Sequence, residues 1–157
     1  LRVIDGEFTE DKRFFLEGFV LGNKERFIAL NEVVVHSGKV AQLIEFNLFI
    51  DDKFVYRQKA DGLIISSPTG STAYAMATGG PILHPGIEAI IVSPICPMSL
   101  SSRPVVVPAA SRLLIKPIGN RTRSVKLWQD GAGCALMEPG DSCIITFPLR
   151  YLGKLVT

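Results

Sequence analysis

Short apolar runs interrupted by glycine and proline constrain the fold of this chain more than any other feature. The 157 residues include 14 Gly and 10 Pro, which separate the apolar runs at intervals of about ten residues. A helical bundle needs longer uninterrupted segments, whereas the strands of an all-β sandwich or barrel have this length and spacing. We therefore predict a mainly β fold, sandwich-like, forming one β-rich domain over residues 1–157.

Alternating side chains and turn residues predict individual strands. Residues 44–50 alternate between apolar and mostly polar side chains, the period of a strand with one buried face. The polar segment 51–53 then predicts a hairpin over 43–56. Pro and Gly within 138–141 predict a second hairpin over 135–146. Further strands are predicted at 13–21, 27–36, 62–66, 89–92, 104–107, 113–116 and 125–128.

A single helix interrupts this pattern. Residues 71–78 contain three alanines and a methionine, which are good helix formers. The segment Gly79-Gly80-Pro81 follows them and predicts the end of the helix. We therefore expect one short helix near 71–78.

Charge and cysteine content exclude several classes of protein. Seventeen Lys and Arg against 15 Asp and Glu give a net charge of +2, too little for the positive face of a nucleic-acid-binding protein. No apolar run reaches the roughly 18 residues that span a membrane. Cys96, Cys134 and Cys143 lie in apolar sequence without metal-ligand spacing, which predicts reduced, buried thiols in a cytoplasmic protein.

A hydroxyl-rich turn after the predicted strand 62–66 is the first candidate site. Thr69, Ser71 and Thr72 surround Gly70, which lets a ligand approach the backbone closely, and Tyr74 adds a flat apolar face. This composition suits a ligand cradle. The alternative is that the hydroxyls only cap the helix.

An amide and a carboxylate stand side by side at the second candidate site. Asn31 and Glu32 precede the β-branched run 33–35. Adjacent side chains of a strand point to opposite faces, so the two reach one ligand only from a loop or bulge. They offer the donors and acceptors that a nucleoside needs, but such a pair can equally be a solvated strand boundary.

Several segments together, in this order, resemble the C-terminal domain of bacterial NAD kinases. The resemblance extends over roughly residues 13–141. It implies a β-rich domain that supplies most of the NAD site, in an enzyme that transfers the γ-phosphoryl group of ATP to the 2′-hydroxyl of the adenosine ribose. The segments are Asn31-Glu32-Val33-Val34-Val35-His36, Asp61-Gly62-Leu63-Ile64-Ile65-Ser66, Pro68-Thr69-Gly70-Ser71-Thr72-Ala73-Tyr74, Gly79-Gly80-Pro81-Ile82 and Pro94-Ile95-Cys96-Pro97.

The resemblance also implies roles for individual residues. Asn31 and Glu32 would bond the ribose and adenine of the nucleotide, and Asp61 would accept a hydrogen bond from the other nucleoside of NAD. Lys59 stands where the family has a basic residue near the ligand. The residues that would line the adenosine pocket are Thr69, Ser71, Thr72, Ala73, Tyr74 and Ala77.

One departure from the family limits what this chain does. The catalytic aspartate of the family belongs to a Gly-Gly-Asp-Gly motif, and this motif does not occur in the sequence. We therefore expect no catalytic residue and no protein-held metal here, and a fragment that is inactive alone. ATP and its Mg²⁺ are expected to bind mainly outside it, in a longer enzyme that forms a homodimer or homotetramer.

Two alternatives remain open at the level of sequence. Diacylglycerol and sphingosine kinases resemble NAD kinases in architecture, so a lipid kinase domain is one. A non-catalytic module for nucleotide binding or oligomerisation is the other. Common motifs of nucleotide hydrolases, α/β-hydrolases and metalloproteases do not occur in the sequence.

Overall fold

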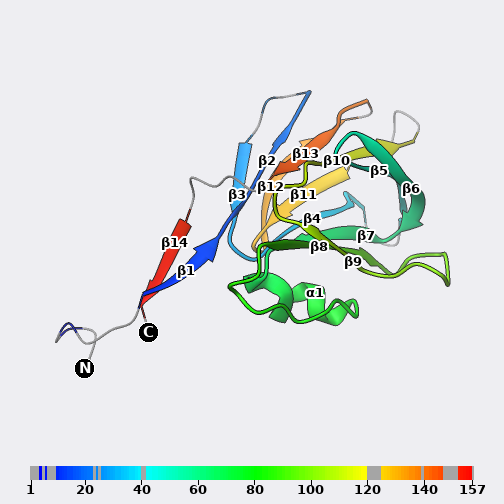
Figure 1. Ribbon diagram of the computed structural model, residues 1–157. Helices are drawn as coiled ribbons and strands as arrows, with labels where there is room; N and C mark the ends of the chain where they lie inside the picture. Colours follow the sequence, from blue (N-terminus) through cyan, green and yellow to red (C-terminus); the bar gives the residue numbers. More distant parts are fainter. Residues whose placement is uncertain are drawn as a thin grey trace.

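Two six-stranded antiparallel sheets form the body of the protein (Figure 1). The computed structural model describes residues 4, 6, 10–22, 24, 26–39, 42–119, 125–138, 140–146 and 152–156. In the first sheet the strands are ordered β3 (Arg26–Ala29), β2 (Leu16–Val20), β13 (Cys143–Thr146), β10 (Leu113–Ile118), β5 (Ile44–Ile50) and β6 (Lys53–Ala60). In the second sheet they are ordered β12 (Ala132–Met137), β11 (Val125–Gln129), β4 (Glu32–Ser37), β7 (Gly62–Ser66), β8 (Ala89–Ile95) and β9 (Val105–Pro108). The prediction of a mainly β fold is confirmed.

Apolar side chains from both sheets form one core. Phe46 and Leu48 on β5 are fully buried, as are Leu63 and Ile65 on β7, and all four belong to one cluster. Alternation along β5 leaves the residues between them partly exposed, because successive side chains of a strand face opposite sides. The core therefore lies between the two sheets, as in a β-sandwich.

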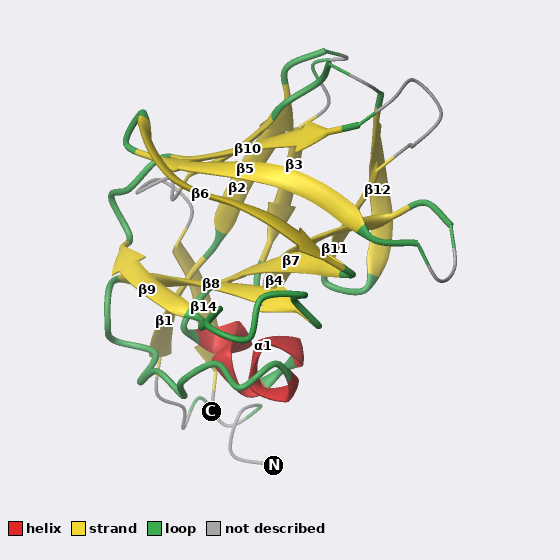
Figure 2. Ribbon diagram, turned by 90° about the vertical axis from the view of Figure 1, so that its right-hand side faces the viewer, coloured by secondary structure: helices red, strands yellow, loops and turns green. Residues whose placement is uncertain are grey.

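Strand β7 is buried on both faces. Every residue of Gly62–Ser66 is buried, although only alternate residues can face the core. Ile64, on the outer face, packs in a second cluster with Val34 of β4 and Ala75. Ala75 belongs to α1 (Tyr74–Ala77), which Figure 2 shows against the second sheet. This cover explains why β7 is apolar throughout.

The predicted helix is present but shorter than expected. A 3₁₀ turn, η1 (Thr69–Thr72), precedes α1, and Ala73 separates the two with a non-helical backbone. The helix ends before Gly79, whose φ of +78° suits glycine. The predicted end of the helix is therefore confirmed, and its first turn is 3₁₀ rather than α-helical.

One of the two predicted hairpins is confirmed and the other is wrong. Strands β5 and β6 pair through Asp51 and Asp52, both with positive φ as a two-residue hairpin turn requires. Around Gly140, by contrast, β12 pairs with β11 in one sheet and β13 with β10 and β2 in the other. The local turn forms, but it carries the chain from one sheet to the other.

Two predicted strands are each divided in the structure. The segment 13–21 is split between β1 (Glu10–Phe14) and β2, and 27–36 between β3 and β4. Strand β1 pairs with β14 (Leu152–Val156) as a two-stranded ribbon that extends away from the body in Figure 1. Each division lets the chain change sheets between consecutive strands.

The prediction for the cysteines is correct for one residue and wrong for another. Cys143 is fully buried in the core. Cys96 is exposed, because β8 ends at Ile95 and the chain turns outward with a φ of +44° at Cys96. The side chain of Cys134 lies outside the described residues.

Candidate functional site

Pairing between β4 and β7 brings the two candidate motifs together. Glu32, the first residue of β4, pairs with Ser66, the last residue of β7. Asn31 precedes β4 and Thr69 follows β7, so the two motifs leave the second sheet at the same end. The backbone N–H of Ser67 donates to the Asn31 carbonyl at 2.9 Å. Asn31 lies in a loop, the condition under which it and Glu32 can serve one ligand.

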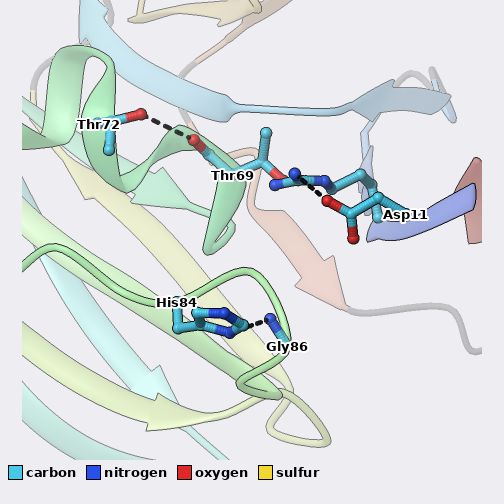
Figure 3. Close-up of polar contacts among 6 residues, drawn as sticks. Asp11, Thr69, Thr72, His84 and Gly86 are labelled. Carbon is cyan, nitrogen blue, oxygen red and sulfur yellow. Dashed lines mark hydrogen bonds and ion pairs between the residues drawn. The ribbon is translucent and has the colours of Figure 1, made fainter. Parts of the chain in front are cut away.

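The hydroxyls of the turn do not cap the helix. Neither η1 nor α1 has a side-chain cap. The buried Ser71 hydroxyl donates to the Pro68 carbonyl at 2.6 Å and accepts the Leu83 N–H at 3.0 Å. The exposed Thr72 hydroxyl donates to the Thr69 carbonyl at 3.4 Å, a long bond visible in Figure 3. Ser71 therefore anchors the 81–87 segment, while Thr72 remains accessible to a ligand.

A cavity of about 410 Å³ runs along the outer face of the second sheet beside this turn. Glu32, Val34 and His36 form its floor, since alternate residues of β4 face the same side. Trp128 of β11 and Tyr74 are walls of the same cavity. Lining of this kind, apolar with a few polar groups, is typical of small-molecule sites.

Glu32 places a buried carboxyl group at the cavity. Its side chain is 8% exposed, and its Oε2 atom has no hydrogen-bond partner among the described residues. Burial raises the pKa of Glu32, the negative charge of Asp130 raises it further, and a backbone hydrogen bond from Tyr74 lowers it. Glu32 is among the residues that line the cavity, and carboxylate oxygens are the acceptors that ligand hydroxyls need.

The structure does not bring every candidate residue to this cavity. Of the sequence candidates, Glu32 and Tyr74 line it. Asn31, Thr69 and Thr72 lie at the end of the sheet where Glu32 lines the cavity, and Ala73 and Ala77 are exposed along the turn and helix. Lys59, on β6, and Asp61 come just before β7 and therefore lie toward the other end, where His36 pairs with Gly62.

Several residues of the cavity were not predicted from sequence. His36 and Trp128 line the cavity together with Lys39, Lys126 and Gly131, and none of them was a site candidate from the sequence. The alternation of Glu32, Val34 and His36 on one face could have indicated the shared floor. The residues from β11 could not be found this way, because their neighbours on β4 are about ninety positions away in sequence.

The described part of the chain offers no metal centre. No group of three or more His, Cys, Asp or Glu residues there is arranged to hold a metal ion. Among the described helices, none has the length and apolar character needed to cross a membrane.

Comparison with known proteins identifies the family. The model of the ATP-NAD kinase C-terminal domain matches residues 30–149. The chain belongs to the ATP-NAD kinase family. NAD kinase 1 of Prochlorococcus marinus is 52% identical over 166 residues, which cover 99% of this chain and 54% of that protein. NAD kinase of Teredinibacter turnerae is 46% identical over 147 residues, covering 92% and 50% respectively.

Solved structures of the family have the same fold. Yeast NADH kinase complexed with NADH matches with a TM-score of 0.91 and 30% identity, covering 99% of this chain and 48% of that one. An NAD kinase from Archaeoglobus fulgidus in complex with ATP matches with a TM-score of 0.77 and 25% identity, covering 98% and 57%. The chain therefore spans about half the length of the relatives it matches.

Proposed function

We propose that the protein carrying this chain is an NAD kinase, which phosphorylates the 2′-hydroxyl of the adenosine ribose of NAD with ATP to give NADP. The observation that carries the proposal is the Glu32 carboxylate, whose Oε2 atom has no hydrogen-bond partner among the described residues. It lies between the Asn31 loop and the Thr69–Thr72 turn at a cavity of about 410 Å³. Relatives named NAD kinase and a related NADH kinase complexed with NADH support it.

The described residues suit nucleoside binding. The Glu32 carboxylate can accept a ribose hydroxyl, and the Asn31 amide can both donate to and accept from a base or ribose. Thr69, Thr72, Ala73 and Ala77 would line the adenosine side, with the exposed face of Tyr74 available for stacking. Ser71 would contribute chiefly by holding the turn in place.

Catalysis and ATP binding are assigned to the rest of the enzyme. Phosphoryl transfer depends on positioning and on neutralising charge, usually with Mg²⁺. The sequence lacks the Gly-Gly-Asp-Gly motif, and its described residues hold no metal cluster. We therefore assign ATP with its divalent cation mainly to residues outside this chain, and expect the chain alone to be inactive. The structure of a related NAD kinase in complex with ATP supports ATP as the phosphoryl donor.

Lys59 and Asp61 would serve the second nucleoside of NAD. Both lie at the end of β7 opposite the Asn31 loop, so one chain does not present them to the same nucleoside. We also propose that the enzyme is a homodimer or homotetramer, in which these residues could contact NAD held by a second copy as well. We further assign the enzyme to the cytoplasm, where the free thiols of Cys96 and Cys143 would stay reduced.

The test is NADP formation by the full-length enzyme. We expect ATP-dependent conversion of NAD to NADP and no phosphorylation of diacylglycerol or sphingosine. Asn31→Ala should raise the KM for NAD by about tenfold, the scale of one lost polar contact in a binding site. Asn47→Ala, on the partly exposed face of β5, is the matched control and should leave KM unchanged. A folded full-length enzyme that makes no NADP would contradict the proposal.

A further inference from the structure

A carboxylate far away in sequence binds the backbone of the Asn31 loop. Asp130 follows β11, and its Oδ1 atom accepts the N–H groups of Asn31 at 2.7 Å and Glu32 at 3.1 Å. Its Oδ2 atom accepts the N–H of Leu30 at 2.7 Å. Three consecutive backbone donors thus end on one carboxylate. Hydrogen bonds to an ionised acceptor are stronger than those between neutral groups.

The backbone of Asp130 completes the contact. Its own N–H donates to the Glu32 carbonyl at 3.1 Å. The ladder between β11 and β4 ends at the pair Gln129 and Val33. The hydrogen bonds of Asp130 therefore connect the two segments just beyond the last paired residues. Positive φ values of +44° at Asp130 and +81° at Gly131 form the tight turn that aims the carboxylate back at the loop.

The carbonyl groups of the same loop are held from the other side. The Ser67 hydroxyl donates to the Leu30 carbonyl at 2.5 Å, and the Ser67 N–H donates to the Asn31 carbonyl at 2.9 Å. The loop backbone is therefore fixed by Asp130 on its donor side and by Ser67 on its acceptor side. With the backbone groups occupied in this way, the loop contacts a ligand through the side chains of Asn31 and Glu32. The Oε2 atom of Glu32 has no hydrogen-bond partner among the described residues.

We infer that Asp130 is a positioning residue of the nucleoside site, whose carboxylate fixes the Asn31 and Glu32 side chains in the geometry that accepts ribose hydroxyls of a dinucleotide. The inference rests on the proposed NAD kinase function. Asp130 acts through the loop backbone, with its own oxygens engaged by N–H groups. Preorganisation of this kind lowers the cost of ordering a site upon binding.

Asp130 also affects the charge of Glu32. It is the acidic group that raises the pKa of Glu32 after burial, against the lowering effect of the Tyr74 backbone. His36, Lys39 and Lys126 line the same cavity and are its basic groups. Because a protonated Glu32 loses acceptor capacity, affinity for NAD should fall as pH drops through the pKa of Glu32.

The test is Asp130→Asn in the full-length enzyme, since Asn tolerates the positive φ. Asp51→Asn is the matched control, because Asp51 also has a positive φ, of +51°, and its Oδ1 atom accepts the Arg112 N–H at 2.8 Å. We expect Asp130→Asn to raise the KM for NAD by about tenfold or more through weakened charge-assisted bonds, with a smaller change in kcat. Asp51→Asn should leave KM unchanged.

The pH profile separates positioning from a purely structural role. The acid limb is the fall in NAD affinity as pH drops. In Asp130→Asn it should move to lower pH, because removing the neighbouring negative charge lowers the pKa of Glu32. In a Glu32→Gln background the same substitution should produce no such movement. An unchanged KM and acid limb in Asp130→Asn would overturn the inference.

A second variant covers the case in which Asp130→Asn does not fold. Asp130→Glu keeps the charge but displaces it by one methylene, so KM should rise while the acid limb stays in place; an unchanged KM would overturn the inference. The proposed function is judged separately by the wild-type enzyme. Failure of the wild type to phosphorylate NAD would contradict that function, whereas an active wild type with unaffected variants at 130 contradicts only the role of Asp130.

Discussion

Gly70 lies directly against the backbone of Asn31. A Cβ atom at position 70 would be 2.2 Å from the Asn31 carbonyl oxygen and 2.5 Å from its carbonyl carbon, well inside van der Waals contact. The neighbouring atoms are backbone and are themselves hydrogen-bonded, since Ser67 donates to this carbonyl. The absence of a side chain at Gly70 is therefore what lets the Thr69–Thr72 turn pack on the Asn31 loop.

Gly70→Ala should consequently separate the two motifs. Overpacking of this kind destabilises proteins by about 1–3 kcal/mol, and the displaced Asn31 should raise the KM for NAD. Gly133→Ala is the matched control, because its Cβ would meet the Trp128 ring at 3.6 Å, an ordinary contact. Urea unfolding and NADP formation measure the two effects. Equal stability of the two variants would contradict the close packing at Gly70.

Ser71 and Thr72 are expected to behave differently although both are hydroxyl residues of one turn. Ser71→Ala removes a buried group that accepts the Leu83 N–H at 3.0 Å, which should cost about 1–3 kcal/mol of unfolding free energy. Thr72→Ala changes an exposed side chain and should shift stability by no more than about 0.5 kcal/mol, while weakening NAD binding. Chemical denaturation and NAD titration of both variants in the full-length enzyme check this contrast. A stable Ser71→Ala enzyme would show that its hydroxyl does not anchor the turn.

The sheets were largely predictable because strand signals are local. The alternation around Phe46 and Leu48 and the turn at Asp51 and Asp52 depend only on neighbours in sequence, and the structure confirms them. The turn at Gly140 was recognised equally well. Its sequence carries no information about which sheet the following strand joins, and that choice depends on β2 and β10, far away in the chain.

The parts of the site that depend on local sequence were predictable, and the contact between distant segments was not. The Asn31-Glu32 pair and the Thr69–Thr72 turn stand out by their residue types, and the pairing of β4 with β7 brings them together. The contact between Asp130 and Asn31 spans 99 positions. Its residues form an ordinary Asp-Gly turn in the sequence, so the role of the carboxylate becomes visible only once β11 is placed beside β4.

Tyr56 offers a test of the core outside the site. It packs beside Phe46 with ring centroids 6.3 Å apart, and its hydroxyl is buried without a hydrogen-bond partner among the described residues. Burial raises the pKa of Tyr56 to about 12, so the phenol stays neutral. Tyr56→Phe removes an unsatisfied polar group and should leave stability unchanged or raise it by up to about 1 kcal/mol. Urea unfolding measures this, and a large loss of stability would reveal a partner for the hydroxyl.

Glu32 should make the stability of the nucleotide-free protein depend on pH. Its pKa is raised from 4.5 by burial first and by Asp130 second, so the folded state binds the proton more readily than the unfolded state. The stabilising contribution is complete below pH 4.5 and is lost as pH rises through the raised pKa. Glu32→Gln does not titrate, so its stability relative to wild type should be greater at pH 8 than at pH 5.

Thermal unfolding of the full-length enzyme without nucleotide, at pH 5 and pH 8, measures this difference. Glu88→Gln replaces an exposed glutamate and serves as the control. Its effect on thermal stability should be small and the same at pH 5 and pH 8. The amide introduced by Glu32→Gln can still accept the Tyr74 N–H, so the comparison isolates the charge. An equal effect of Glu32→Gln at the two pH values would mean that burial and Asp130 do not act on the folded-state carboxyl as the geometry requires.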